Sequence, residues 1–139
     1  MIALILPCSV HANDWMFNKF MDDGNLVKYV KTGTLENSIY YIESTGRRYF
    51  AIVGSLSTCK AASNESSEVL AVINKTAAYG TSKCTSDGVL GIEFNDWFTS
   101  AIIHEFIKSK SVSFQFMSGP KFTYSAIGFS KAYNHLISN

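Results

Sequence analysis

Two sets of side chains in this chain could do chemistry, and the first resembles part of a metal-binding motif. The segment "HEFIK" at residues 104–108 begins like the His-Glu-x-x-His helix of zinc proteases, in which two histidines one turn apart bind the metal. Lys108 stands where the second histidine is needed, and at helical spacing His104 shares a face with Ser100 and Lys108. That composition is typical of a solvated helix face, so we predict no metal ligand and no catalytic residue here.

The second set is the three cysteines, and whether their thiols oxidise depends on the role of the opening stretch "MIALILPCSVHA". The apolar run at residues 2–6 is followed by Val10 and Ala12, which occupy the −3 and −1 positions of a cut before Asn13. This is the layout of a secretory signal peptide. We predict that residues 1–12 are removed and that residues 13–139 form one domain, periplasmic or secreted. A buried first strand is the alternative interpretation of the same apolar run.

Removal of the signal peptide would take Cys8 with it and leave Cys59 and Cys84 in an oxidising compartment, where two cysteines form a disulfide by default. Closing this loop of about 26 residues would stabilise the fold by about 3.5 kcal/mol on the chain-entropy model. A zinc site lacks further ligands at the usual spacing, and a catalytic thiol lacks an identifiable base. We therefore predict a disulfide between Cys59 and Cys84.

The tip of an expected hairpin carries Arg47, Arg48 and Tyr49, which are candidate contacts for a partner. The alternative is that these are solvated side chains beside a turn and contact no partner. The whole chain has 12 Lys and Arg against 11 Asp and Glu, a net charge of +1. This balance predicts neither a nucleic-acid partner nor an electrostatic attraction to membranes. No apolar run beyond the first dozen residues is long enough to span a bilayer, so we expect no membrane span after signal removal.

Alternating or apolar runs bounded by turn residues predict a strand-rich domain. The hairpin at residues 37–56 has apolar side chains on both faces of each arm, which predicts central strands that are buried on both sides. Turns are expected at Asp23-Gly24, at Asp87-Gly88 and around Gly119. The expected strands lie at residues 15–20, 26–33, 37–44, 48–56, 69–80, 89–94, 111–118 and 121–127, with a polar loop at residues 59–68.

Two segments follow the helical period instead. Residues 97–110 place Phe98, Ile102 and Phe106 on one side, with either Asn95 or Asp96 as the N-cap. Residues 128–136 form a short amphipathic helix whose apolar stripe is Phe129, Ala132, Tyr133 and Leu136. The predicted fold is therefore mainly β: a β-sandwich of short antiparallel strands with one mid-chain helix and a C-terminal helix.

Several of these segments resemble a group of periplasmic proteins that includes the invasion-associated locus B family and the type VI secretion-associated TagO-like proteins. The similar stretches are "DWMFNKFMDDGNLVKYV" near the start, "SLSTC" in the middle, and "FIKSKSVSFQF" followed by "FTYSAIGFSKAYNHL" at the end. The resemblance implies a small exported β-sandwich protein that binds something in the cell envelope, with no known catalysis.

No acid–base constellation is visible in the sequence, so we expect neither an enzyme nor a cofactor. The predicted function is that of a binding protein with a protein partner in the envelope, an accessory of a secretion or virulence system. The alternative is an exported inhibitor or immunity protein that blocks a toxin or a lytic enzyme. Neither hypothesis identifies the partner or the oligomeric state.

Overall fold

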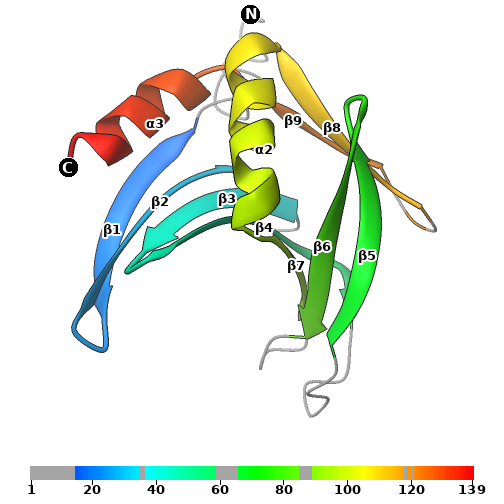
Figure 1. Cartoon of the computed structure of the whole chain (residues 1–139), viewed down its shortest axis with the longest axis horizontal. Coiled ribbons are helices and arrows are strands. Elements are labelled where there is room, and N and C mark those ends of the chain that lie inside the picture. The colour runs from blue at the N-terminus through cyan, green and yellow to red at the C-terminus, as the bar shows by residue number, and fades with distance from the viewer. Residues whose placement is uncertain (1–14, 35–36, 59–65, 85–88, 118, 120) are drawn as a thin grey trace, which may run out of the picture.

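The computed structural model describes residues 15–34, 37–58, 66–84, 89–117, 119 and 121–139 (Figure 1). In chain order the described elements are β1 (Met16–Asp22), β2 (Asn25–Gly33), β3 (Asn37–Ser44), β4 (Arg47–Thr58), β5 (Ser66–Ile73), β6 (Thr76–Cys84), β7 (Val89–Phe94), α2 (Asp96–Lys108), β8 (Ser111–Phe116), β9 (Lys121–Ser125) and α3 (Phe129–Ile137).

All nine described strands belong to one antiparallel sheet with the order β1-β2-β3-β4-β7-β6-β5-β8-β9. Strands that are consecutive in sequence pair within three meanders: β1 to β4, β5 to β7, and β8 with β9. Tight turns close these hairpins. Asp23 and Gly24 between β1 and β2 both have positive φ, 48° and 81°, as the Asp-Gly pair predicts.

Helix α2 lies against the concave side of the curled sheet, which we call the inner face (Figure 1). Asn95 begins the helix, because its side chain accepts a hydrogen bond from the Trp97 N–H, and Asp96 occupies the first turn. The ring of Phe106 lies at the centre of an aromatic cluster, with ring centroids 5.0 Å from Trp15 and 5.1 Å from Phe129. Burial of these rings supplies much of the apolar area that holds helix and sheet together.

Helix α3 covers the inner face of β1 and β2. Gly128 precedes it with a φ of 89°, so the chain can turn from β9 into the helix without the strain that a side chain would cause. Phe129, Ala132 and Leu136 are buried and Tyr133 is half-buried, as the sequence period predicts. An isolated helix of this length would be marginal in water, so docking of this stripe stabilises it.

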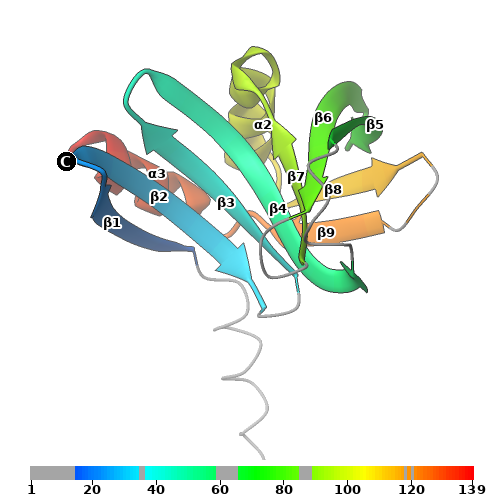
Figure 2. The ribbon, with the colours of Figure 1, turned by 90° about the horizontal axis from the view of Figure 1, so that it is seen from below.

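The two ends of the sheet approach one another. The indole N–H of Trp15, just before β1, donates a hydrogen bond of 2.9 Å to the carbonyl oxygen of Ser125 at the end of β9. The hydroxyl of Tyr124 donates to the side-chain oxygen of Asn37 at the start of β3. These contacts fold the sheet around the core, so that its two halves flank the helices (Figures 1 and 2).

The prediction of a mainly β domain of antiparallel strands with a mid-chain helix and a C-terminal helix is confirmed. The two layers expected of a sandwich are the two halves of one curled sheet. The predicted signal peptide at residues 1–12, Cys59 and the turn at Asp87-Gly88 lie outside the described residues.

Two details differ from the sequence-based expectation. Residues 69–80 are not one strand, because the chain reverses at Asn74 and Lys75 and pairs β5 with β6. The strands β3 and β4 are central as expected, but they are deeply buried on the inner face only, where Ile39, Tyr41 and Phe50 lie. Side chains on their other face remain half-exposed in the described structure.

Candidate functional site

The three candidate partner contacts predicted from the sequence separate onto two faces of the sheet. Arg47 and Tyr49 lie on the face away from the helices, which we call the outer face, because alternate residues of a strand point to opposite sides. The guanidinium of Arg47 lies 4.5 Å from the centroid of the Tyr49 ring and forms an ion pair with Glu93. The Arg47 side chain is 61% exposed, so it remains accessible to a partner.

Arg48 points to the inner face and joins the sheet to α2. Its Nε donates to Asp96 Oδ1 at 2.6 Å, and its terminal nitrogen donates to Ser100 Oγ at 2.6 Å. The hydrogen bond with Asp96 is the main cause of a pKa for Arg48 above its usual value. Arg48 is thus engaged within the fold, and Arg47 and Tyr49 are the members of the predicted trio that lie on the outer face.

Arg47 and Tyr49 belong to a larger aromatic surface on the outer face of β1 to β4. Strand register places its members on the same side, and Figure 2 shows these strands with α2 and α3 behind them. Phe20 is 50% exposed, and the others with aromatic or branched side chains are partly exposed. We name this surface the outer patch; it comprises Phe20, Tyr29, Lys31, Tyr40, Ile42, Arg47 and Tyr49.

Neighbouring side chains of the outer patch contact one another across the strands. The rings of Tyr29 and Tyr40 have centroids 5.7 Å apart, and Phe20 lies 6.1 Å from Tyr29. Lys31 places its ammonium 5.6 Å from the Tyr40 ring. Protein interfaces are enriched in aromatic residues and arginine, whereas a sheet face exposed to solvent is ordinarily polar. The outer patch is therefore a candidate protein-binding surface.

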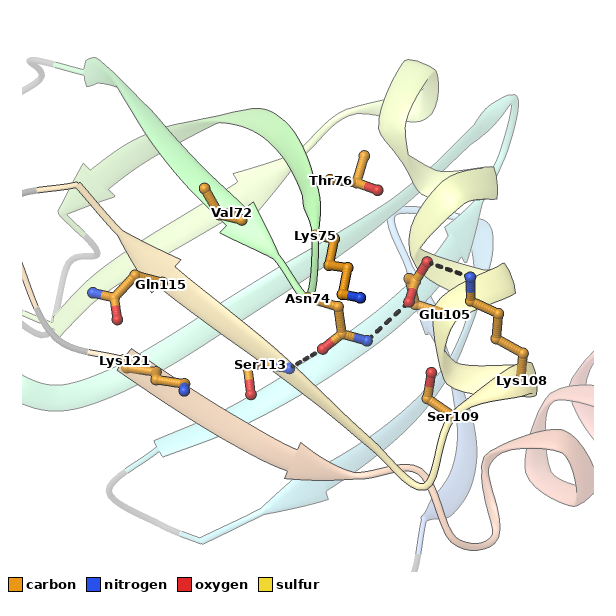
Figure 3. Close-up of a pocket in the computed structure, with 10 residues that line it drawn as sticks. All are labelled: Val72, Asn74, Lys75, Thr76, Glu105, Lys108, Ser109, Ser113, Gln115 and Lys121. Atoms are coloured by element: carbon orange, nitrogen blue, oxygen red, sulfur yellow. Dashed lines mark hydrogen bonds and ion pairs between the residues drawn. The ribbon is translucent and has the colours of Figure 1, made fainter.

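A second candidate site is a polar cleft of about 790 Å³ between the end of α2, the β5–β6 turn and the β8–β9 hairpin (Figure 3). Lys75, Lys108 and Lys121 line it, together with hydroxyl and amide side chains such as Ser113 and Gln115. Glu105 is the one acidic side chain among the described lining residues and pairs with Lys108 at 3.2 Å. The excess of positive charge suits a small anionic ligand.

Asn74 organises this cleft. Its backbone has a φ of 55°, and its side-chain oxygen accepts a hydrogen bond from the Ser113 N–H at 3.0 Å. Its side-chain nitrogen donates to Glu105 Oε1 at 2.8 Å, so one residue joins the β5–β6 turn to both β8 and α2 (Figure 3). This hydrogen bond, followed by the pairing with Lys108, holds the pKa of Glu105 below its usual value.

The residues of the "HEFIK" segment follow the sequence-based interpretation. His104 is exposed on α2, in line with Ser100 and Lys108, and Phe106 faces the core. The lowered pKa keeps Glu105 ionised near neutral pH, paired with Lys108. Within the described ranges, no group of three or more His, Cys, Asp or Glu side chains is placed to hold a metal ion.

The cleft and its turn were missed from the sequence because residues 69–80 look like one apolar run. The polar pair Asn74-Lys75 in its middle was the available indication, since asparagine tolerates positive φ. The outer patch had a clearer indication: apolar side chains on both faces of residues 37–56. The same pattern is also typical of strands that are buried on both sides.

Neither described helix is long and apolar enough to cross a membrane. Comparisons of the chain with protein-family models, with curated proteins and with solved structures returned no match. The resemblance to the invasion-associated locus B and TagO-like families therefore stays a prediction.

Proposed function

We propose that this chain is an exported, non-catalytic protein that binds a protein partner in the cell envelope, as an accessory of a secretion or virulence system. The observation that carries the binding role is the outer patch, an aromatic surface with two cations on a sheet face that the described helices leave uncovered. Export and the envelope location rest on the opening stretch and on the family resemblance.

The composition of the outer patch suits a protein partner better than a small molecule. Its tyrosines present large, rigid rings with a polar tip, and Arg47 can both stack and form paired hydrogen bonds. Burial of such anchors typically supplies most of the affinity of an interface. The patch extends over four neighbouring strands, so it is broad rather than concave, as protein interfaces often are.

Removal of two anchors should strongly weaken partner capture without unfolding the protein. We expect envelope extracts of the native host to yield a partner on the immobilised protein, and Arg47→Ala combined with Tyr49→Ser to weaken its capture by at least about 30-fold, as hot-spot truncations do. The measurement is quantitative mass spectrometry of the eluates. Lys121→Ala, in the cleft beyond β8, is the matched control and should capture as the wild type does.

The identity of the captured protein separates the two functional hypotheses. A component of a secretion or envelope apparatus supports the accessory role, whereas a toxin or a lytic hydrolase supports the inhibitor alternative. Equal capture by the wild type and by the double variant would exclude the outer patch as the binding surface. Circular dichroism of both variants shows whether the fold is retained.

The proposed disulfide is supported by strand topology. Thr58 at the end of β4 pairs with Val89, and Cys84 at the end of β6 pairs with Leu90, so both strands end beside the start of β7. The end of β4, which Cys59 follows in the sequence, and Cys84 therefore lie on the two sides of the same end of β7.

Export and the disulfide can be tested in one measurement. Protein isolated from the native host and digested without reduction should give an N-terminal peptide that starts near Asn13. The same digest should contain a peptide pair joined through Cys59 and Cys84, because both thiols would have met an oxidising compartment. An intact chain that begins at Met1, or thiol reagents that label both cysteines in the unreduced denatured protein, would contradict the proposal.

A further inference from the structure

Strand β1 forms one edge of the sheet, and its other side is not paired with any described strand. Every residue of β1 except Phe17 is exposed, including Met16, Phe20 and Met21 at 59%, 50% and 64%. An exposed edge of this length and apolar character is a template for pairing with another extended segment, and proteins usually guard such edges with charges or proline. Here the strand carries Lys19 in its middle, Asp22 at its last position, and no proline.

The geometry of the β1–β2 hairpin defines which backbone groups face the open side. Asp22 and Asn25 flank a two-residue turn and form its closing pair, and hydrogen-bonded pairs then alternate along an antiparallel ladder. Phe17, Lys19 and Met21 therefore direct their N–H and C=O groups away from β2. In agreement, the Lys19 N–H donates at 2.8 Å to the side-chain oxygen of Asn18, not to β2. A neighbouring side chain thus satisfies an edge donor that an added strand could use.

A groove of about 700 Å³ runs between the start of β1 and helix α3. Met16 and Phe17 line it from the strand, and Lys131, Asn134, His135 and Ser138 line it from the helix. The rings of Phe17 and His135 are 4.6 Å apart and connect the two walls. An extended segment paired with β1 would point alternate side chains toward this groove, because successive residues of a strand alternate in direction.

The charges of the groove favour an acidic occupant. Among the described residues that line the groove, Lys131 is charged and none is acidic, and Lys19 lies on the same face of β1 as Phe17. A second copy of the chain suits the groove less well. Its own β1 would bring Lys19 toward the face of α3 that carries Lys131, and like charges brought close together repel.

We propose that an extended acidic segment of a partner protein pairs with β1 as a further strand of the sheet, with alternate side chains in the groove between β1 and α3. Glutamate or aspartate side chains of the segment pair with Lys131 and His135, and its backbone displaces the Asn18 side chain from the Lys19 N–H. The proposal rests on the binding function proposed above and adds a separate surface and a mode of recognition to it.

A synthetic peptide tests the proposal with purified protein. The probe is a fluorescent nine-residue peptide of alternating threonine and valine with glutamate at two positions of the same face, and the control peptide has lysine at those two positions. Fluorescence anisotropy should detect binding of the glutamate peptide and at least about tenfold weaker binding of the lysine peptide, as expected for two reversed charge contacts.

Three substitutions and one control test the pairing of the peptide with β1. Lys19→Pro removes an outward N–H at an edge position that tolerates proline, and should weaken binding by on the order of tenfold. Lys131→Glu should weaken it similarly, and it serves as the independent variant in case Lys19→Pro disturbs β1. Asn18→Ala frees the Lys19 N–H and should tighten binding by about threefold. Lys121→Glu makes the same charge change outside the groove and should have no effect.

Equal binding of the two peptides, or binding that neither Lys19→Pro nor Lys131→Glu weakens, would overturn the proposal. A dimer in sedimentation analysis that Lys19→Pro converts to a monomer would assign the edge to a second copy and would also overturn it. The outer-patch variants should bind the peptide normally. Partner capture through the outer patch can therefore fail while peptide binding persists, or the reverse.

Discussion

Replacing Phe129 with alanine should lower the free energy of unfolding by about 3 to 5 kcal/mol, through lost apolar burial and the cavity that remains. The ring is fully buried at the meeting point of both helices and the start of the sheet. Its centroid lies 4.9 Å from Trp15, 5.1 Å from Phe106 and 5.5 Å from Tyr133. Aromatic neighbours on several sides leave little freedom for the structure to close the gap.

Urea unfolding followed by circular dichroism measures this effect. Lys131→Ala, two residues along α3 but exposed, is the matched control and should change stability by less than about 0.5 kcal/mol. If the two variants shift the unfolding midpoint equally little, α3 is not a structural cap on the sheet. Phe129 and Tyr133 would then have to be reconsidered as surface residues.

Asn74→Ala should lower the free energy of unfolding by about 2 to 4 kcal/mol. The change removes the hydrogen bonds to Ser113 and Glu105 and leaves an alanine in a left-handed backbone conformation. A charged or backbone group that loses its hydrogen-bond partner costs about 1 to 3 kcal/mol. A left-handed backbone conformation costs a residue other than glycine a further amount of about 1 to 2 kcal/mol. The same urea titration gives the value.

Asn74→Gly separates the two contributions, because glycine accepts positive φ but cannot make the side-chain hydrogen bonds. We expect it to recover about 1 kcal/mol relative to Asn74→Ala. Lys75→Ala, at the exposed neighbouring turn position, is the control and should be nearly neutral. Equal stability of Asn74→Ala and the wild type would show that the β5–β6 turn does not depend on this side chain.

The effect of Asn74→Gly should also depend on pH. The hydrogen bond from Asn74 lowers the pKa of Glu105 below the usual 4.5, so its stabilisation is fully present above that value. It is lost as the pH falls through the lowered pKa of the folded state. The difference in stability between the wild type and Asn74→Gly should thus be larger at pH 7 than near pH 2. A difference that grows on acidification would contradict this assignment.

Local features of the fold were predictable because local chemistry determines them. Asp23-Gly24 specifies a turn with positive φ, and Asn95 caps a helix whose buried residues follow the helical period. The C-terminal helix was predictable for the same reason, because its apolar stripe is buried only when that side of the helix faces the sheet. These features locate the β1–β2 hairpin and both described helices.

Three-dimensional relations were not predictable in the same way. An apolar run does not reveal that the chain reverses at Asn74, because the stabilising partners Glu105 and Ser113 are distant in sequence. Adjacent arginines alternate between faces, but only the assembled structure shows that Arg48 meets Asp96 and that Arg47 remains exposed. Apolar side chains on the second face of β3 and β4 likewise do not reveal whether that face is covered.

The strand order also has a consequence for how the chain folds. Six of the eight neighbouring strand pairs join consecutive strands, whereas β4–β7 and β5–β8 join strands that are distant in sequence. Loop-closure entropy opposes distant pairings most, and folding slows as such pairings increase. The three meanders can form early as separate local units, and their joining at β4–β7 and β5–β8 carries the main entropic barrier. A bond between Cys59 and Cys84 would shorten the effective loop at the first junction, so oxidation after export would favour the step that a reduced chain finds most costly.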